Sequence, residues 1–365
     1  MKVMQKRVLS ILLIVAMLLT LLPATAFAAE VYYLDENGDK KYVNAKPIDK
    51  IDAVLKNSNG YDGWYVVSNN QMMNQTVRIT GNIKLILKDG SLLSINGDSN
   101  HAGIEIDKGC SLSIYGQEKG TGVLRVLGGS NSAGIAGTSG SSIQIYGGET
   151  MVISGKNSAI CIGGSGDNSG FGTIGIHGGK VANIEYNGTN YGILGGNAAE
   201  GDSIIITGGT IFGYDIDSNM CGFELGSKEL SVPITIDGGF VNTKKIHGSV
   251  KNSAGEEVIL HKFTLPDARY KTISTGSINE IPLAIKADAK NGKYGIRDVS
   301  TDQYGDLYFF LPESQKNLRF TIWDGSEYWR NNAVGTDVVL RKVGIPYTEP
   351  SSTVFNPKKP KDIIN

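Results

Sequence analysis

One short motif recurs along the middle of the chain and constrains the fold more than any other feature of the sequence. In each copy two apolar residues stand two positions apart, and a glycine follows shortly after. The first glycine of each copy is Gly116, Gly147, Gly178, Gly208 and Gly238, so the copies lie 31, 31, 30 and 30 residues apart. A fixed period of this length is typical of a solenoid, in which each repeat forms one coil and stacks on its neighbours.

The motif has the period of a β-strand, because every second residue is apolar. The sequence therefore predicts two buried columns that run from coil to coil. The first is Leu112, Ile143, Ile174, Ile204 and Ile234, and the second is Ile114, Ile145, Ile176, Ile206 and Ile236. Glycine pairs at the corners of the coils account for much of the high glycine content, 48 of 365 residues. We predict an all-β chain built around a right-handed parallel β-helix with about 30 residues per coil, followed by a small C-terminal β module.

The rest of the chain divides around this repeat. Lys2, Lys6 and Arg7 precede an apolar run from Val8 to Leu22, and Ala26-Phe27-Ala28 follows it, a pattern typical of a signal peptide and its cleavage site. The predicted divisions are a signal peptide at 1–28, an N-terminal β cap at 29–75, the parallel β-helix at 76–255, a small β-sandwich-like module at 256–343 and a linker or disordered tail at 344–365. We expect the mature chain to be secreted or held at the cell surface, with no membrane span after signal cleavage.

The mature chain is close to neutral. The full sequence has 35 basic and 36 acidic residues, and the first 28 residues contain three basic and no acidic ones, which leaves 32 − 36 = −4. A chain with this charge has no bulk electrostatic attraction for nucleic acid or for an anionic membrane. We therefore expect a monomer that binds no nucleic acid.

Three segments resemble a known group of proteins, in the order in which they occur. They are Gly63-Trp64-Tyr65-Val66-Val67, Leu85-Ile86-Leu87-Lys88-Asp89-Gly90 and Leu112-Ser113-Ile114-Tyr115-Gly116-Gln117. With the repeated strands that follow, they resemble the Gly-rich parallel β-helix region of secreted and surface adhesin-like, carbohydrate-binding-type proteins of Gram-positive bacteria. The resemblance implies binding of an extracellular polysaccharide or host glycan without catalysis. In fold the helix also looks like pectin-degrading lyases, so a polysaccharide lyase or glycoside hydrolase is the alternative.

An outward column beside the glycine corners offers a candidate ligand site. From coil to coil it is expected to contain Lys88, Tyr115, Tyr146, His177, Thr207 and Asp237. Neighbouring strands lie about 4.8 Å apart, so the rings of Tyr115 and Tyr146 are expected to form a flat aromatic platform on which a sugar docks. We predict that Tyr115, Tyr146 and His177 bind the ligand. The alternative is ordinary cross-strand packing at a corner next to glycine.

Metal binding and catalysis have fewer candidates. Asp215 and Asp217 stand on one side of a short strand and are the candidate Ca²⁺ ligands, the alternative being solvated loop residues. No other cofactor is expected. No catalytic residue is named, because the arginines of the coil region, Arg78 and Arg125, have no clear Asp cluster beside them. The coils also contain no Asp-Asp doublet of the kind a glycosidase would use.

Overall fold

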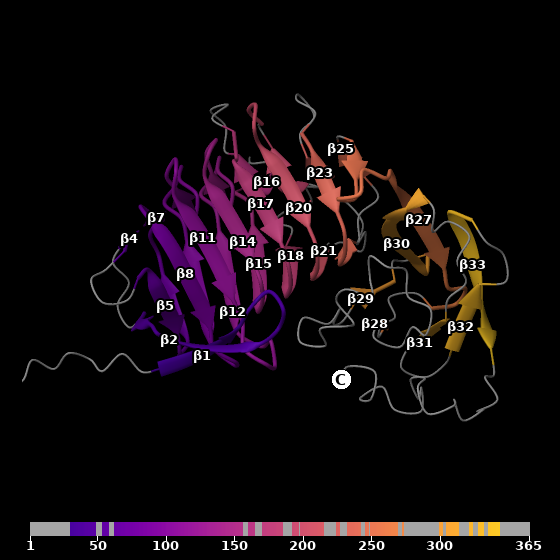
Figure 1. Cartoon of the computed structure of the whole chain (residues 1–365), viewed down its shortest axis with the longest axis horizontal. Coiled ribbons are helices and arrows are strands. Elements are labelled where there is room, and N and C mark those ends of the chain that lie inside the picture. The colour runs from indigo at the N-terminus through magenta and orange to yellow at the C-terminus, as the bar shows by residue number, and fades with distance from the viewer. Residues whose placement is uncertain are drawn as a thin grey trace, which may run out of the picture.

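The computed structural model describes residues 30–48, 53–57, 62–155, 160–164, 170–184, 192–196, 198–214, 224–226, 232–241, 245–247, 249–268, 272–273, 299–301, 304–313, 321–323, 328–331 and 335–343. Every regular element in these residues is a β-strand. Most of the strands lie in three parallel sheets, and Figure 1 shows them stacked side by side as the coils of a solenoid. The predicted all-β class and parallel solenoid are therefore confirmed.

The first sheet has nine strands and carries the repeated motif. Its order is β26-β23-β20-β17-β14-β11-β8-β5-β3. The strands are β3 (Lys46–Pro47), β5 (Trp64–Val67), β8 (Asn82–Leu87), β11 (Ser111–Tyr115), β14 (Ser142–Ile145), β17 (Thr173–Ile176), β20 (Ser203–Ile206), β23 (Ile234–Ile236) and β26 (Val250–Lys251). The parallel ladder thus reaches into the segment that the sequence assigned to an N-terminal cap.

Two further parallel sheets complete each coil. The eight-stranded sheet contains β4 (Val54–Leu55), β7 (Val77–Ile79), β10 (Ile104–Ile106), β13 (Ile135–Gly137), β16 (Ile160–Gly164), β19 (Gly192–Gly196), β22 (Glu224–Gly226) and β25 (Lys245–His247). The seven-stranded sheet contains β6 (Gln71–Met73), β9 (Leu92–Asn96), β12 (Val123–Leu127), β15 (Glu149–Ile153), β18 (Lys180–Ile184), β21 (Thr210–Tyr214) and β24 (Phe240–Val241). Neighbouring strands of one sheet come from successive coils, so the three sheets enclose one core.

The two predicted apolar columns form the centre of this core. Ile174 pairs with Ile143 on one side and with Ile204 on the other, which keeps the register of about 30 residues per coil. All ten side chains of the two columns are buried, and none is more than 1% exposed. Burial of one such side chain contributes about 1.5–3 kcal/mol, so the stacked columns supply much of the stability that a single coil lacks.

The second glycine of each pair has a backbone conformation that the corner requires. Gly148 has a φ of 74° and Gly179 a φ of 71°, in the left-handed region that strains other residues. A side chain at Gly179 would also collide with the backbone of Gly147 and Gly148 in the preceding coil. The repeated glycines therefore let successive coils approach closely at this corner.

An antiparallel hairpin precedes the solenoid, as its Asn-Gly pair predicts. Strand β1 (Glu30–Leu34) pairs with β2 (Lys40–Asn44), and Figure 1 shows the hairpin crossing the outer side of the first coils. The Leu34 amide donates to the Gly116 carbonyl at 3.0 Å, and Val31 joins a buried apolar cluster on the sheet. The hairpin therefore covers part of the side of the nine-stranded sheet.

A five-stranded sheet of order β30-β27-β33-β32-β31 follows the solenoid. Its strands are β27 (Val258–Thr264), β30 (Asp306–Pro312), β31 (Thr321–Trp323), β32 (Tyr328–Asn331) and β33 (Asp337–Val343), and β28 (Thr272–Ile273) pairs separately with β29 (Val299–Ser300). Val258 and Phe310 belong to the same buried cluster as Ile236 in the last coils, so the solenoid core continues into this sheet. The predicted signal peptide and tail lie outside the described residues, and the domain boundaries stay predictions.

Candidate functional site

The outer side of the nine-stranded sheet carries three parallel columns of side chains. We call the part on β11, β14, β17 and β20 the polar face. It consists of the outward residues of these strands and the residue after each of the last three: Ser111, Ser113, Tyr115, Ser142, Gln144, Tyr146, Thr173, Gly175, His177, Ser203, Ile205 and Thr207. All are half-buried except Gly175, which is buried. None is Asp, Glu, Lys or Arg.

The structure brings the three predicted site residues together in one stack. The rings of Tyr115 and Tyr146 are 4.8 Å apart and inclined by 6°, and those of Tyr146 and His177 are 4.8 Å apart and inclined by 18°. Both faces of the Tyr146 ring are therefore covered by neighbouring rings. The stack differs from the expected flat platform, because a sugar cannot reach these faces and meets ring edges and polar atoms instead.

The hairpin covers the Tyr115 end of this stack. The Tyr33 ring packs edge-on against Tyr115 at 4.7 Å, and the Trp64 ring lies 5.3 Å from Tyr115. Burial raises the pKa of the Tyr115 hydroxyl strongly. In the preceding coil the position next to Tyr115 is held by Ile86 rather than by Lys88, which corrects the expected column. Tyr146 and His177 are thus the members of the stack that lie beyond these hairpin contacts.

A chain of hydrogen bonds links three strands across the polar face. Gln144 Nε2 donates to Ser142 Oγ at 2.8 Å, and Gln144 Oε1 lies 2.7 Å from Nε2 of His177. On the other side of the ring, Nδ1 of His177 lies 2.8 Å from Thr207 Oγ1. Burial lowers the pKa of His177, while the charge of Glu36 opposes the shift. A neutral His177 donates its Nε2 proton to Gln144 and accepts the Thr207 hydroxyl proton at Nδ1.

The sequence analysis did not identify Gln144, Gly175 or Glu36 as parts of this site. Gly175 makes the Gln144–His177 contact possible, because a Cβ there would overlap the Gln144 amide and approach Nε2 of His177 to 2.6 Å. A lone glycine inside a strand, where other copies of the motif carry a side chain, was the available signal. Glu36 comes from the hairpin tip, and no local pattern connects it to the coils.

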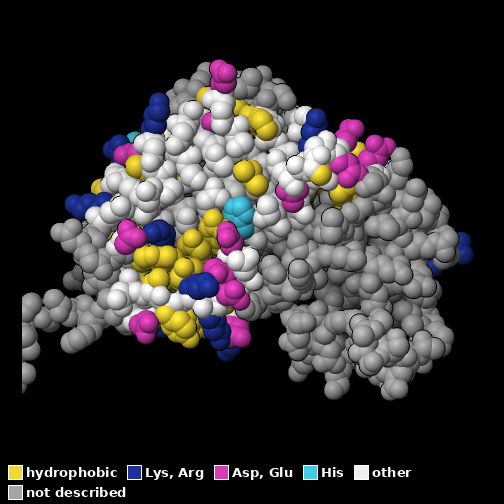
Figure 2. Space-filling view, viewed as in Figure 1, with side chains coloured by type: hydrophobic (Ala, Val, Ile, Leu, Met, Phe, Trp, Pro, Cys, Tyr) yellow, Lys and Arg dark blue, Asp and Glu magenta, His cyan; other side chains and the backbone are white. Residues whose placement is uncertain are grey.

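Glu36 is the acidic residue whose charge acts on the ring stack. Burial first and the Glu36 charge second raise the pKa of the Tyr146 hydroxyl. The Glu36 side chain is exposed. Figure 2, which views this side of the molecule, shows hydrophobic side chains gathered beside a histidine, with acidic and basic side chains around them. Two elements distant in sequence, the hairpin tip and the polar face, therefore meet at one place.

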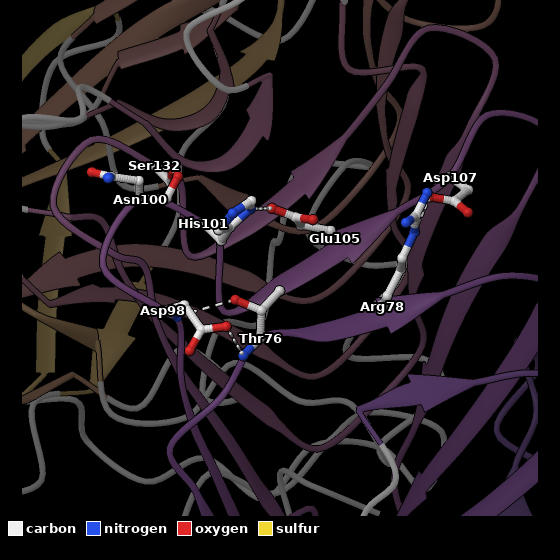
Figure 3. A network of polar contacts seen from close by, with 8 residues as sticks. All are labelled: Thr76, Arg78, Asp98, Asn100, His101, Glu105, Asp107 and Ser132. Carbon is white, nitrogen blue, oxygen red and sulfur yellow. Dashed lines mark hydrogen bonds and ion pairs between the residues drawn. The ribbon is translucent and has the colours of Figure 1, made fainter.

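Charged groups on the neighbouring faces of the coils form separate pairs (Figure 3). Arg78 Nε donates to Asp107 Oδ1 at 2.8 Å, and His101 Nδ1 lies 2.9 Å from Glu105 Oε1. The Arg78 pKa is raised, first by its hydrogen bond with Asp107. Because its hydrogen bond with Asp107 holds Arg78 in the protonated form, the contact fits a link between successive coils rather than a base that abstracts a proton from a substrate.

The structure offers no metal cluster in the part of the chain it describes. No group of three or more His, Cys, Asp or Glu side chains there is placed to hold a metal ion. Asp215 and Asp217, the candidate Ca²⁺ ligands, lie outside the described residues. Within the described residues, no helix has the length and apolar character needed to cross a membrane.

Comparison of the chain with known protein families, with curated proteins and with solved structures found no match.

Proposed function

We propose that this chain is an exported, adhesin-like β-helix protein that binds an extracellular polysaccharide or host glycan on the polar face, without catalysis. The observation that carries the proposal is the composition and regular spacing of this face. One column of the face presents a hydroxyl on each of four strands, about 4.8 Å apart, and the face contains no Asp, Glu, Lys or Arg.

Such a surface suits a linear polymer of sugars. Four strands span about 14 Å along the solenoid, and a polymer lying along the hydroxyl column meets a hydroxyl at each step. The side chains of the face are half-buried, so hydrogen bonds to them are less exposed to competing water than those at a fully open surface. Ser142, Thr173 and Ser203 form one row of hydroxyls for this purpose.

Within this proposal Tyr146 and His177 bind the ligand through ring edges and polar atoms. Tyr115 supports them from beneath the hairpin. The hydrogen bonds of His177 with Gln144 and Thr207 fix the imidazole, so its orientation is set before a ligand arrives. A preorganised group loses less conformational entropy on binding. Export follows from the predicted signal peptide at residues 1–28.

A polysaccharide screen combined with a degradation assay tests the proposal. Purified protein is run by affinity electrophoresis through gels that contain plant or mucosal polysaccharides, and each polymer that retards it is then incubated with the protein and sized. We expect retardation by at least one polymer with no change in chain length. Shortening of the polymer would replace binding with the lyase or hydrolase alternative. Free migration in every gel would contradict the proposal.

A further inference from the structure

The tip of the hairpin is built to hold Glu36 in a fixed place. Asp35 Oδ1 accepts hydrogen bonds from the amides of Asn37 at 3.0 Å and Asp39 at 2.8 Å, so the turn on either side of Glu36 is closed. The Gly38 amide also donates to the Asp35 carbonyl at 2.8 Å. The turn therefore fixes the backbone from which the Glu36 carboxylate projects.

The hairpin is in turn fixed to the solenoid beside the polar face. Gln117 Nε2 donates to the Tyr32 carbonyl at 2.8 Å, and Lys40 forms an ion pair with Glu118 at 2.6 Å. Tyr33 packs against both Trp64 and Tyr115, with ring centroids 4.6 and 4.7 Å away. The Leu34 amide, two residues before Glu36, donates to the Gly116 carbonyl next to Tyr115. Contacts on both strands of the hairpin thus fix the turn that carries Glu36 beside the ring stack.

The charge of Glu36 is not balanced on the polar face. Within the described part of the chain the structure shows no ion pair or hydrogen bond of its carboxylate, and its side chain is exposed. The polar face contains no lysine or arginine. A ligand on this face therefore meets a negative charge, with no positive group of the face to offset it.

This arrangement discriminates between sugars by charge. A uronate or sulfated sugar would bring a second negative charge near Glu36 and find no cation on the polar face to replace the water that it loses. Lys40 and Lys41 of the hairpin are already paired with Glu118 and Asp35. An uncharged sugar instead offers hydroxyl donors, and a hydroxyl that donates to a carboxylate forms a charge-assisted hydrogen bond. The same carboxylate therefore favours one class of glycan and disfavours the other.

We infer that the polar face selects uncharged polysaccharides and that Glu36 is the residue that rejects anionic ones. This inference rests on the polysaccharide binding proposed above and specifies its ligand class. It separates the site from that of a uronate-binding or uronate-cleaving β-helix, which would need positive groups where this face has Gln144, Gly175 and Ile205.

The test compares the same polymers with and without charge. Mannan, galactan and β-glucan are each used untreated and after oxidation of their primary hydroxyls to carboxylates. Affinities are measured for the unaltered protein, Glu36→Gln, Glu36→Lys and the control Glu105→Gln, which removes a glutamate from the eight-stranded sheet. We expect the unaltered protein to prefer the untreated form. Glu36→Lys should improve binding of the oxidised form about fivefold, the effect of one close exposed charge pair, and salt should reduce the gain.

The possible outcomes distinguish charge selection by Glu36 from polysaccharide binding on the polar face. Equal or tighter binding of the oxidised polymers by the unaltered protein would overturn the charge selection and leave polysaccharide binding in place. A preference for untreated polymers that Glu36→Lys does not change, or that Glu105→Gln changes equally, would overturn the role of Glu36. Failure to bind any untreated or oxidised polymer would overturn the proposed function and the inference together.

Discussion

The side-chain amide of Gln144 occupies the space that a side chain at position 175 would need, and from there it contacts His177 at 2.7 Å. The contact joins strand β14 to the residue after β17. The contact depends on Gly175, whose φ lies outside the left-handed region. Alanine at this position would therefore adopt the backbone conformation without strain, and its Cβ would collide with the Gln144 amide.

Gly175→Ala should displace Gln144 and break its hydrogen bond with His177. Because the displaced group is the end of a flexible side chain, the loss in unfolding free energy should be only about 1 kcal/mol. NMR signals of the His177 imidazole should shift, and polysaccharide affinity should fall. The matched control is Thr235→Ala, further along the same column. Unchanged His177 signals together with unchanged affinity in Gly175→Ala would contradict the role of this contact.

Tyr146→Ala should weaken polysaccharide binding while the solenoid stays folded. The variant removes the ring edge and the hydroxyl that meet the ligand, and a hydrogen bond contributes about 0.5–1.5 kcal/mol, so the loss in affinity should be about tenfold at most. Affinity electrophoresis measures the loss, and circular dichroism checks the fold. Met72→Ala, on the seven-stranded sheet, serves as the control. If the two variants bind equally well, Tyr146 is no part of the site.

Ile174→Asp should destabilise the whole solenoid. The substitution buries a carboxylate without a partner between Ile143 and Ile204, at a cost of several kcal/mol. Thr173→Asp, one residue earlier and half-buried on the polar face, should cost far less. Denaturant unfolding of both variants measures the difference. Similar unfolding midpoints would show that the two faces of this strand are not distinguished as the structure has them.

Acidification should destabilise the protein through the half-buried His177 and the buried His261. Burial lowers the pKa of His177 and of His261 from the ordinary value of 6.5. The folded state then binds fewer protons than the unfolded state, so stability present above pH 6.5 is lost as the pH falls from there toward the folded pKa values. Thermal unfolding between pH 7.5 and 5 should show this loss, and His261→Phe should reduce it. A pH-independent melting temperature, or an unchanged loss in the variant, would contradict the assignment.

The repeat predicted the fold because both the alternation of apolar residues and the spacing of the copies can be read directly from the sequence. The alternation around Ile174 indicates which face of the strand is buried. The 30-residue period indicates which residues become neighbours in successive coils. Together they predict the two core columns. The structure also brought Tyr115, Tyr146 and His177 together as the same column implied. Their mutual orientation was not predictable, because it depends on side-chain rotation rather than on register.

The rest of the site depends on contacts that no periodic pattern encodes. Glu36 acts on His177 only because the hairpin folds back across the first coils, a tertiary contact set by Tyr33 and its neighbours. Gln144 reaches His177 only because position 175 lacks a side chain. Asp215 and Asp217 lie outside the described residues, so the proposal of a Ca²⁺ site there stays a prediction.

Hydroxyl-radical footprinting tests the location of the polysaccharide site most directly. The oxidation rates of individual side chains are compared in the presence and absence of a saturating polysaccharide that retards the protein. Tyr146 and His177 should be protected, while Met72 and Tyr304, which are 70% and 63% exposed away from the polar face, should react at unchanged rates. Protection of Met72 or Tyr304 with unchanged oxidation of Tyr146 and His177 would contradict binding on the polar face.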